Sequence, residues 1–407
     1  MFGLTRFELQ MALVVLLIQF VNIVDFMMVM PLGPDFALML DIPVGSLGVI
    51  TAAYVSAAAT ITFVTARYMD RLPRRELLVG CLIGLGMTAL ITPTLGQTFG
   101  LNGLLLGRAL AGLFGGPATS LALTVLADAI PAAKRGRANG IASGAFSVSA
   151  VVGVPFGLEL ARLGDWTLPF EALGILALVV SLFTWWGIPK HLQTRRLGQW
   201  PGTRQFLSRR KTALALAVVF VTPLSGFLFI PNMAAYFQFN LGYPRELMGL
   251  LYATGGTCAL FSMQIAGLAI DRFGLLPAAL ILGAGAAVIA TLLFGFNPLL
   301  APILLLFSGL MIFNSARNVL ANTASSLVPT PDERGAHMAF QGTVRHLGTG
   351  VGAVAGAFLL ETDGDGRLLN IPTLLGLYLI ILSFQPILTY VLTRTLKSEQ
   401  SAPIDAA

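Results

Sequence analysis

Long apolar segments, separated by short polar or charged breaks, recur along the whole chain. Each has close to the roughly 20 residues that a helix needs to cross a bilayer. The pattern predicts twelve membrane-spanning helices, at about 9–32, 47–66, 77–95, 101–126, 140–161, 168–188, 212–237, 247–270, 276–296, 299–322, 338–360 and 371–393. The alternating pattern of an outer-membrane barrel does not occur in the sequence, so we expect an all-α membrane protein.

The composition supports this class. Of 407 residues, 56% are hydrophobic and 11% are charged, and the mean hydropathy is +0.82. The first apolar segment is too long for the hydrophobic region of a signal peptide, so we expect it to remain as the first helix. Cys81 and Cys258 lie in predicted spans without disulfide or metal-ligand spacing, and we interpret both as packing residues.

The placement of the basic residues explains the net charge of +6. If the N-terminus is cytoplasmic, nineteen Lys and Arg lie in cytoplasmic segments, three lie in outer loops and three lie within spans. The positive-inside rule therefore predicts that both termini are cytoplasmic in a multi-pass protein of the inner (plasma) membrane. Because these basic residues lie in loops and not in a folded soluble domain, the sequence predicts no nucleic-acid partner. His346 has no ligand cluster around it, so we expect no metal site.

A basic stretch divides the twelve spans into two sets of six. We predict an N-terminal bundle at 1–188, a cytoplasmic linker at 189–211, a C-terminal bundle at 212–393 and a cytoplasmic tail at 394–407. The halves also repeat in sequence, since the segment that begins at Arg135 aligns without gaps with the segment that begins at Arg334. Tandem six-helix units in one orientation predict two bundles with a binding cavity between them.

Two motifs in the first half identify a resemblance. The loop ARYMDRLPRRELL between the second and third spans is similar to the signature loop of the major facilitator superfamily, matching it at Asp70, Arg71, Arg74 and Arg75. In the fourth span, LLLGRALAGLFGG places Arg108 and Gly112 as in the helix 4 motif of the proton-driven exporters of that superfamily. The loop departs from the family at two glycine positions, which Ala66 and Pro73 occupy here.

A third motif narrows the resemblance to one branch. The sequence GVPFG that begins at Gly153, followed by GDW, is similar to helix 5 of the arabinose-efflux-like permeases among the drug and metabolite:proton antiporters. The resemblance covers essentially the whole chain. It implies a fold of two six-helix bundles, a small-molecule substrate, protons as the coupling ion and no cofactor other than the proton gradient; we expect a monomer.

Charged residues within spans are costly, at about 2.5 to 3.5 kcal/mol each, and therefore need an explanation. Asp25 and Arg108 both lie about 9 to 11 Å below the outer boundary, by the rise of 1.5 Å per residue. Gln19, Asn22 and Asp25 are spaced three apart and share a face of the first helix. We interpret Asp25 as the proton-coupling carboxylate, kept ionised by Arg108; the alternative is a fixed ion pair that fastens the first helix to the fourth.

The deep charges of the second half are positive. Arg317 and Arg345 are its buried bases, and Asn314, Asn318 and Asn322 recur every four residues around Arg317. With Gln19 and Asn22, we assign to the substrate cavity Asn314, Arg317, Asn318 and Arg345, because a guanidinium offers a rigid set of donors to an anionic or carbonyl-bearing substrate. The alternative is that the two arginines cap helix carbonyls or reach the membrane surface.

The family resemblance further implies that Asp70, Arg71, Arg74 and Arg75 form a cytoplasmic gate with the eleventh helix; alternatively these arginines only fix topology. We expect no enzyme activity, and no nucleotide-binding motif is present in the sequence. The predicted function is proton-coupled export of a drug, sugar or other metabolite by alternating access. The alternatives are a facilitator or importer of the same fold, and a membrane scaffold or receptor that does not transport.

Overall fold

The structure is a computed structural model of the chain, and it describes residues 4–65, 73–131, 134–190, 208–296, 300–329 and 334–400. Within these ranges the chain is helical, and the pairing of Thr362 with Leu368 is an isolated bridge rather than a strand. The all-α expectation is therefore confirmed. The predicted linker lies mostly outside the described residues.

The first half consists of long helices with short turns between them. They are α1 (Arg6–Met28), α2 (Gly33–Leu40), η1 (Val44–Ser46), α3 (Leu47–Thr65), α4 (Arg74–Ala129), α5 (Arg135–Val148), η4 (Ser149–Gly153), α6 (Val154–Leu163) and α7 (Thr167–Gly187). Gly100 has φ 56° and ψ −133°, so α4 is two helices joined at a sharp reversal. That conformation is accessible to glycine because it has no Cβ. A π-helical turn at η4 connects α5 to α6 as one span.

The second half repeats this design. Its elements are α9 (Arg210–Phe227), η5 (Ile230–Asn232), α10 (Met233–Ala235), η6 (Tyr236–Asn240), η7 (Arg245–Leu247), α11 (Met248–Phe273), α12 (Leu275–Ala290), η8 (Thr291–Gly295), α13 (Leu300–Ser326), α14 (Arg334–Leu359) and α15 (Ile371–Gln400). Several of the longer helices contain proline, among them α9 at Pro223 and α15 at Pro386. The short elements η5, α10 and η6 continue the span of α9 to Asn240, and the turn that follows leads through η7 to α11.

Ten helical segments of the described chain are long and apolar enough to cross a membrane. One of these is α4, which counts as two spans because of its reversal at Gly100. α14 takes the place of the eleventh predicted span, although its first half, RGAHMAFQGTVRH, is polar. Together these helices account for the twelve spans that the hydrophobic pattern predicts.

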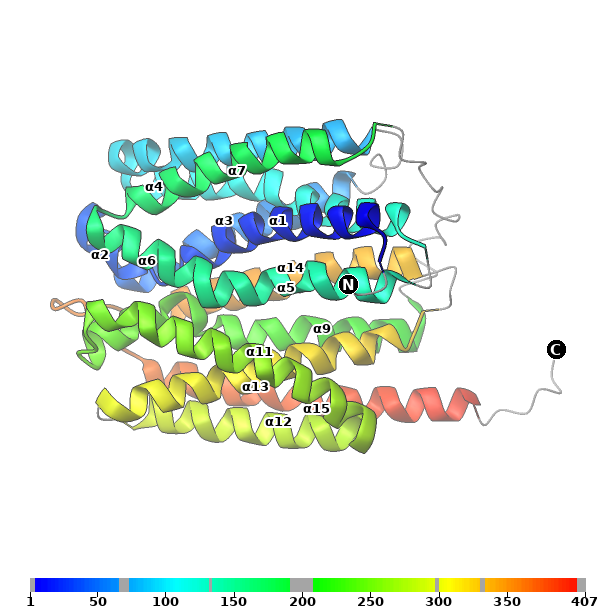
Figure 1. Cartoon of the computed structure of the whole chain (residues 1–407). Coiled ribbons are helices and arrows are strands. Elements are labelled where there is room, and N and C mark those ends of the chain that lie inside the picture. Colours follow the sequence, from blue (N-terminus) through cyan, green and yellow to red (C-terminus); the bar gives the residue numbers. More distant parts are fainter. Residues whose placement is uncertain are drawn as a thin grey trace.

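The helices lie side by side along one direction, and both ends of the chain lie at the same end of the bundle (Figure 1). We call this the terminal end and the opposite one the far end. The far end holds the turn from α1 to α3, the turn at Gly100 and the turn from α9 to α11. In Figure 1 the first-half helices form the upper part of the molecule, and most of the second-half helices form the lower part. α14 packs against both α9 and α3, so it contacts both halves.

The two halves contact each other at the far end through polar groups and one aromatic pair. Arg245 donates from Nε and Nη2 to the two carboxylate oxygens of Asp35, at 3.1 and 2.9 Å. The backbone N–H of Gly45 donates to Thr362 Oγ1 at 3.0 Å. The ring of Phe227 lies 5.9 Å from that of Phe26, between ring centroids. The far end is therefore closed in this structure.

Candidate functional site

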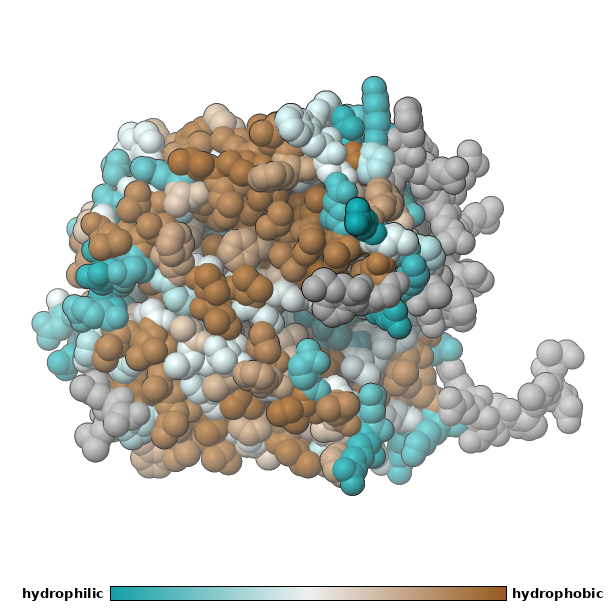
Figure 2. Space-filling view, in the orientation of Figure 1, coloured by the Kyte–Doolittle hydropathy of each residue, from teal (hydrophilic) through white to brown (hydrophobic). Residues whose placement is uncertain are grey.

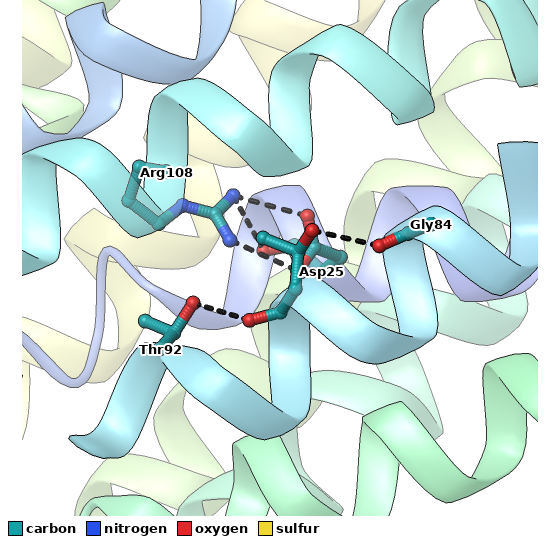
Figure 3. A network of polar contacts seen from close by, with 5 residues as sticks. Asp25, Gly84, Thr92 and Arg108 are labelled. Atoms are coloured by element: carbon teal, nitrogen blue, oxygen red, sulfur yellow. Dashed lines mark hydrogen bonds and ion pairs between the residues drawn. The ribbon is translucent and has the colours of Figure 1, made fainter. Parts of the chain in front are cut away.

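Asp25 and Arg108 form a buried ion pair (Figure 3). Arg108 donates from Nη1 to Asp25 Oδ1 at 2.9 Å and from Nη2 to Asp25 Oδ2 at 3.1 Å, and Nη2 also donates to the Asp25 carbonyl oxygen at 3.1 Å. The exposed side-chain fractions are 2% for Arg108 and 0% for Asp25. Such a pair is bidentate and shielded from water, which makes it strongly directional.

Three helices build the surroundings of this pair. α1 supplies Asp25, the second segment of α4 supplies Arg108, and α3 supplies Tyr54, whose ring centroid lies 4.7 Å from Arg108 Cζ. Phe26, which follows Asp25 in sequence, contacts the ring of Tyr54 at 5.4 Å and also the ring of Phe227 in the other half. An aromatic contact between the halves therefore lies next to the ion pair.

Two threonine hydroxyls near the pair form hydrogen bonds within their own helix. Figure 3 shows Thr92 on the first segment of α4, donating to the carbonyl of Thr88, while Thr88 donates to the carbonyl of Gly84; both distances are 2.7 Å. These threonines therefore use their protons on backbone acceptors. Within the part of the chain that the structure describes, the side-chain partner of Asp25 is Arg108.

Two buried polar atoms beside the pair have no hydrogen-bond partner among the described residues. They are Arg108 Nε, a donor, and Asn22 Oδ1, an acceptor. The amide nitrogen of Asn22 donates to the Ile18 carbonyl at 2.9 Å, and that of Gln19 donates to the Thr119 carbonyl at 3.4 Å. Because buried polar groups are almost always paired, one free donor and one free acceptor here indicate a place for water or a polar ligand.

Arg317 lies in a separate polar cluster of the second half. It is 1% exposed and donates from Nε to Gln385 Oε1 at 2.6 Å and from Nη2 to Ser225 Oγ at 2.9 Å. Gln385 in turn donates to Thr222 Oγ1 at 2.9 Å. The guanidinium thus points between α9 and α15, and hydrogen bonds within the bundle hold it there, with a longer contact of 3.4 Å to Asn314.

Arg345 belongs to a second cluster, between α14 and α13. It donates to Asn318 Oδ1 at 3.4 Å and to Asn322 Oδ1, which also accepts from Gln341 at 2.9 Å. The structure therefore brings Arg345 to Asn318 and Asn322, whereas Arg317 contacts Asn314 of this face and makes its shorter hydrogen bonds to Gln385 and Ser225. Among the described residues, no hydrogen bond or ion pair joins either arginine to Asp25 or Arg108.

The predicted gate residues divide into two groups. Asp70 and Arg71 lie outside the described residues. Arg74 forms an ion pair with Asp128 at the end of α4, and both side chains are buried. Arg75 donates to the Ile188 carbonyl at 3.5 Å, and its Cζ lies 4.0 Å from the Trp185 ring centroid. These contacts of Arg74 and Arg75 are with residues of the first half.

Two further residues emerge only from the structure. Tyr54 covers the guanidinium of Arg108 with its ring. Asn232, in η5 at the junction with α3 and α14, is 2% exposed, and both its side-chain oxygen and nitrogen lack a partner among the described residues. In the sequence, Tyr54 is an ordinary aromatic residue of an apolar span. Asn232 directly follows Pro231 within the predicted seventh span, and this neighbouring proline is the one feature of the sequence that marks it.

Comparison with known sequences identifies relatives of one kind. The sequence matches the profile of the Major Facilitator Superfamily over residues 15–353 and again over residues 215–405. It is 25% identical over 282 residues to an uncharacterized MFS-type transporter, YfhI, of Bacillus subtilis, an alignment that covers 62% of this chain and 67% of the relative. It is 27% identical over 193 residues to a chloramphenicol resistance protein of Streptomyces lividans, covering 47% of this chain and 48% of that protein.

Solved structures of similar shape are transporters. A bacterial homolog of the human lysosomal transporter Spinster, in an inward-facing and occupied conformation, has a TM-score of 0.76 and 18% identity, covering 97% of this chain and 98% of its own. The nucleoside transporter NupG has a TM-score of 0.68 and 14% identity, covering 97% of this chain and 100% of its own. At these identities the likeness establishes the fold.

Proposed function

The chain belongs to the major facilitator superfamily of membrane transporters, and we propose that it exports a small organic molecule in exchange for protons. The family establishes that the chain is a multi-pass transporter rather than an enzyme. The observation that carries the proposal is the buried Asp25–Arg108 pair, with a free donor on Arg108 and a free acceptor on Asn22 beside it. A chloramphenicol resistance protein among the relatives favours export.

The proposed coupling uses competition between a proton and the substrate for the Asp25 carboxylate. An ionised Asp25 accepts two hydrogen bonds from the guanidinium, and a protonated Asp25 is a weaker acceptor for a cation. A hydrogen-bond donor of the substrate is also accepted better by the ionised Asp25 than by the protonated one, so protonation weakens substrate binding and substrate binding promotes proton release. Because Phe26 contacts Phe227, a change at Asp25 is transmitted to the contact between the halves.

We further propose an orientation and a working state. The positive-inside rule places the terminal end in the cytoplasm and assigns the chain to the inner membrane. A closed far end then corresponds to an inward-facing transporter, in agreement with the inward-facing conformations of the Spinster homolog structures. In this state Arg74 and Arg75 are bonded within their own half.

Transport by purified protein in sealed vesicles tests the proposal. A panel of labelled compounds, with chloramphenicol first, is presented to vesicles that carry an imposed pH gradient. We expect one or more compounds to move against their own gradient, and movement to stop when a proton ionophore collapses the pH difference. Movement that proceeds equally without a pH gradient would instead identify a facilitator of the same fold.

A cross-link between residues 35 and 245 is expected to stop transport. These positions belong to different halves and meet at the closed far end, which has to open for alternating access. The double variant Asp35→Cys/Arg245→Cys, joined by a short cleavable thiol cross-linker, should lose transport and recover it when the linker is cleaved. The single variant Asp35→Cys, treated alike, is the control. Unchanged transport in the cross-linked protein would show that the far end need not open.

The same ion pair predicts a pH dependence. Burial raises the pKa of the Asp35 carboxyl above its ordinary value, although the Arg245 guanidinium opposes the rise. The closed far end therefore binds a proton at Asp35 more readily than an open far end in which this carboxyl is hydrated. By linkage, acidification should favour the closed far end, and Asp35→Asn should weaken this dependence, as reported by spin-label distances across the far end.

A further inference from the structure

We propose that a groove between α1 and α7 is a binding site for an anionic phospholipid. The groove has a volume of about 470 Å³ and lies along the outside of the first half, at the terminal end. Its lining is apolar along most of its length and basic at one end; it includes Arg6, Leu13, Leu17, Phe183, Trp186 and Gly187. The proposal concerns the lipid-facing surface and is independent of the direction and coupling of transport.

The groove faces outward from the bundle. The exposed fractions are 45% for Leu13, 38% for Leu17, 59% for Phe183 and 79% for Trp186. Figure 2 shows an apolar surface over α7 and α1 that gives way to hydrophilic residues toward the terminal end. In a protein that spans a bilayer, such a surface contacts lipid acyl chains. Trp186 lies at the end of α7, where tryptophan is typical of the boundary between membrane and water.

The length of the groove fits one acyl chain of one leaflet. From Arg6 to Leu17, α1 rises by about 16 Å at 1.5 Å per residue. Half of a bilayer's hydrocarbon core is about 15 Å thick. An acyl chain that follows α1 from the level of Leu17 therefore brings its headgroup to the level of Arg6.

The charge at the open end selects the headgroup. Arg6 is exposed, and no carboxylate in the described ranges forms an ion pair with it. The nearest acid on the same helix is Glu8, which is 6% exposed and accepts from the Thr5 N–H at 2.7 Å and from Lys134 Nζ at 3.0 Å. Glu8 is thus neutralised within the protein. A guanidinium left free beside an apolar groove matches a lipid phosphate without a cationic amine.

Native mass spectrometry of the full-length protein in detergent tests this site. The protein is titrated with dioleoylphosphatidylglycerol, which is anionic, and separately with dioleoylphosphatidylcholine, which is zwitterionic. We expect the first phosphatidylglycerol to bind more tightly than the first phosphatidylcholine. Arg6→Gln should weaken phosphatidylglycerol binding about fivefold, the usual effect of one basic residue at a membrane surface, and leave phosphatidylcholine binding unchanged.

Matched variants distinguish lipid binding in this groove from nonspecific attraction of anionic lipid to basic residues elsewhere on the protein. Arg394→Gln removes an exposed arginine from the same end of the other half and should leave both affinities unchanged. Leu13→Trp fills the groove and should weaken both lipids, whereas Leu280→Trp, at an exposed position on α12, should not. Equal affinity for the two lipids, a preference that survives Arg6→Gln, or equal loss in Arg394→Gln would each overturn the proposal.

Discussion

Asp25→Asn is expected to abolish pH-gradient-driven transport, with the rate falling to that of vesicles without protein. Asparagine keeps a hydrogen-bond acceptor for Arg108 but cannot release a proton. If Asp25 carries the proton, substrate exchange at equal pH should persist in this variant, because binding does not require the carboxylate to titrate. The measurement compares uptake driven by an imposed pH gradient with counterflow at equal pH in the same vesicles.

The competing explanation is that Asp25 and Arg108 only fasten α1 to α4. Breaking a buried ion pair by removing one partner costs about 3 to 5 kcal/mol, because the remaining charge is left unpaired. Loss of transport in the single variant could then result from misfolding. A thermal unfolding measurement on Asp25→Asn in detergent is therefore part of the experiment.

The double variant Asp25→Asn/Arg108→Gln separates the two explanations. It removes both charges and leaves an uncharged hydrogen-bonded pair, so most of the lost stability should return. A fixed ion pair predicts that pH-driven transport returns with it. A proton-carrying Asp25 predicts a stable protein without coupled transport. Coupled transport in the double variant would eliminate Asp25 as the proton site.

Much of the fold follows from the sequence because the bilayer imposes a length on every helix. The hydrophobic pattern places the spans close to their observed bounds, and the glycine at residue 100 marks the reversal within α4. The first helix ends at Met28, about one turn before the predicted boundary. The turn that contains Pro31 ends the helix before the apolar segment ends, and a hydropathy pattern does not detect such a turn.

The environment of the site is harder to predict. Counting residues from the helix ends puts Asp25 and Arg108 at one level, but side-chain direction depends on how α3 packs, and Tyr54 covers the guanidinium from that helix. The direction of Arg317 depends likewise on Gln385, which is 68 residues away in sequence. The partner of Asp35 is 210 residues away, and nothing in the sequence relates the two positions.

Glycine-to-alanine substitution should have opposite effects at two positions of the second half. In α14, Gly348 and Gly352 face the backbone of α9, and a Cβ on Gly352 would lie 2.5 Å from the Leu224 carbonyl oxygen. Gly352→Ala must therefore move one helix, which costs about 1 to 3 kcal/mol by analogy with overpacked cores. In α15, Gly376 has nothing within 4 Å of the same atom, so Gly376→Ala should gain the helix propensity of alanine.

Thermal unfolding of both variants in detergent measures the difference, with a lower Tm expected for Gly352→Ala and an equal or higher Tm for Gly376→Ala. The contact matters for transport because α14 also packs against α3 of the other half, where a Cβ on Gly350 would meet Val55 Cγ2 at 3.1 Å. The α14–α3 contact is equally close at the far end, where a Cβ on Gly48 would lie 2.3 Å from the Ala353 carbonyl oxygen, so α14 is held on both sides in this closed state. Equal Tm values for the two variants would show that the α14–α9 contact is loose enough to accept a Cβ at residue 352.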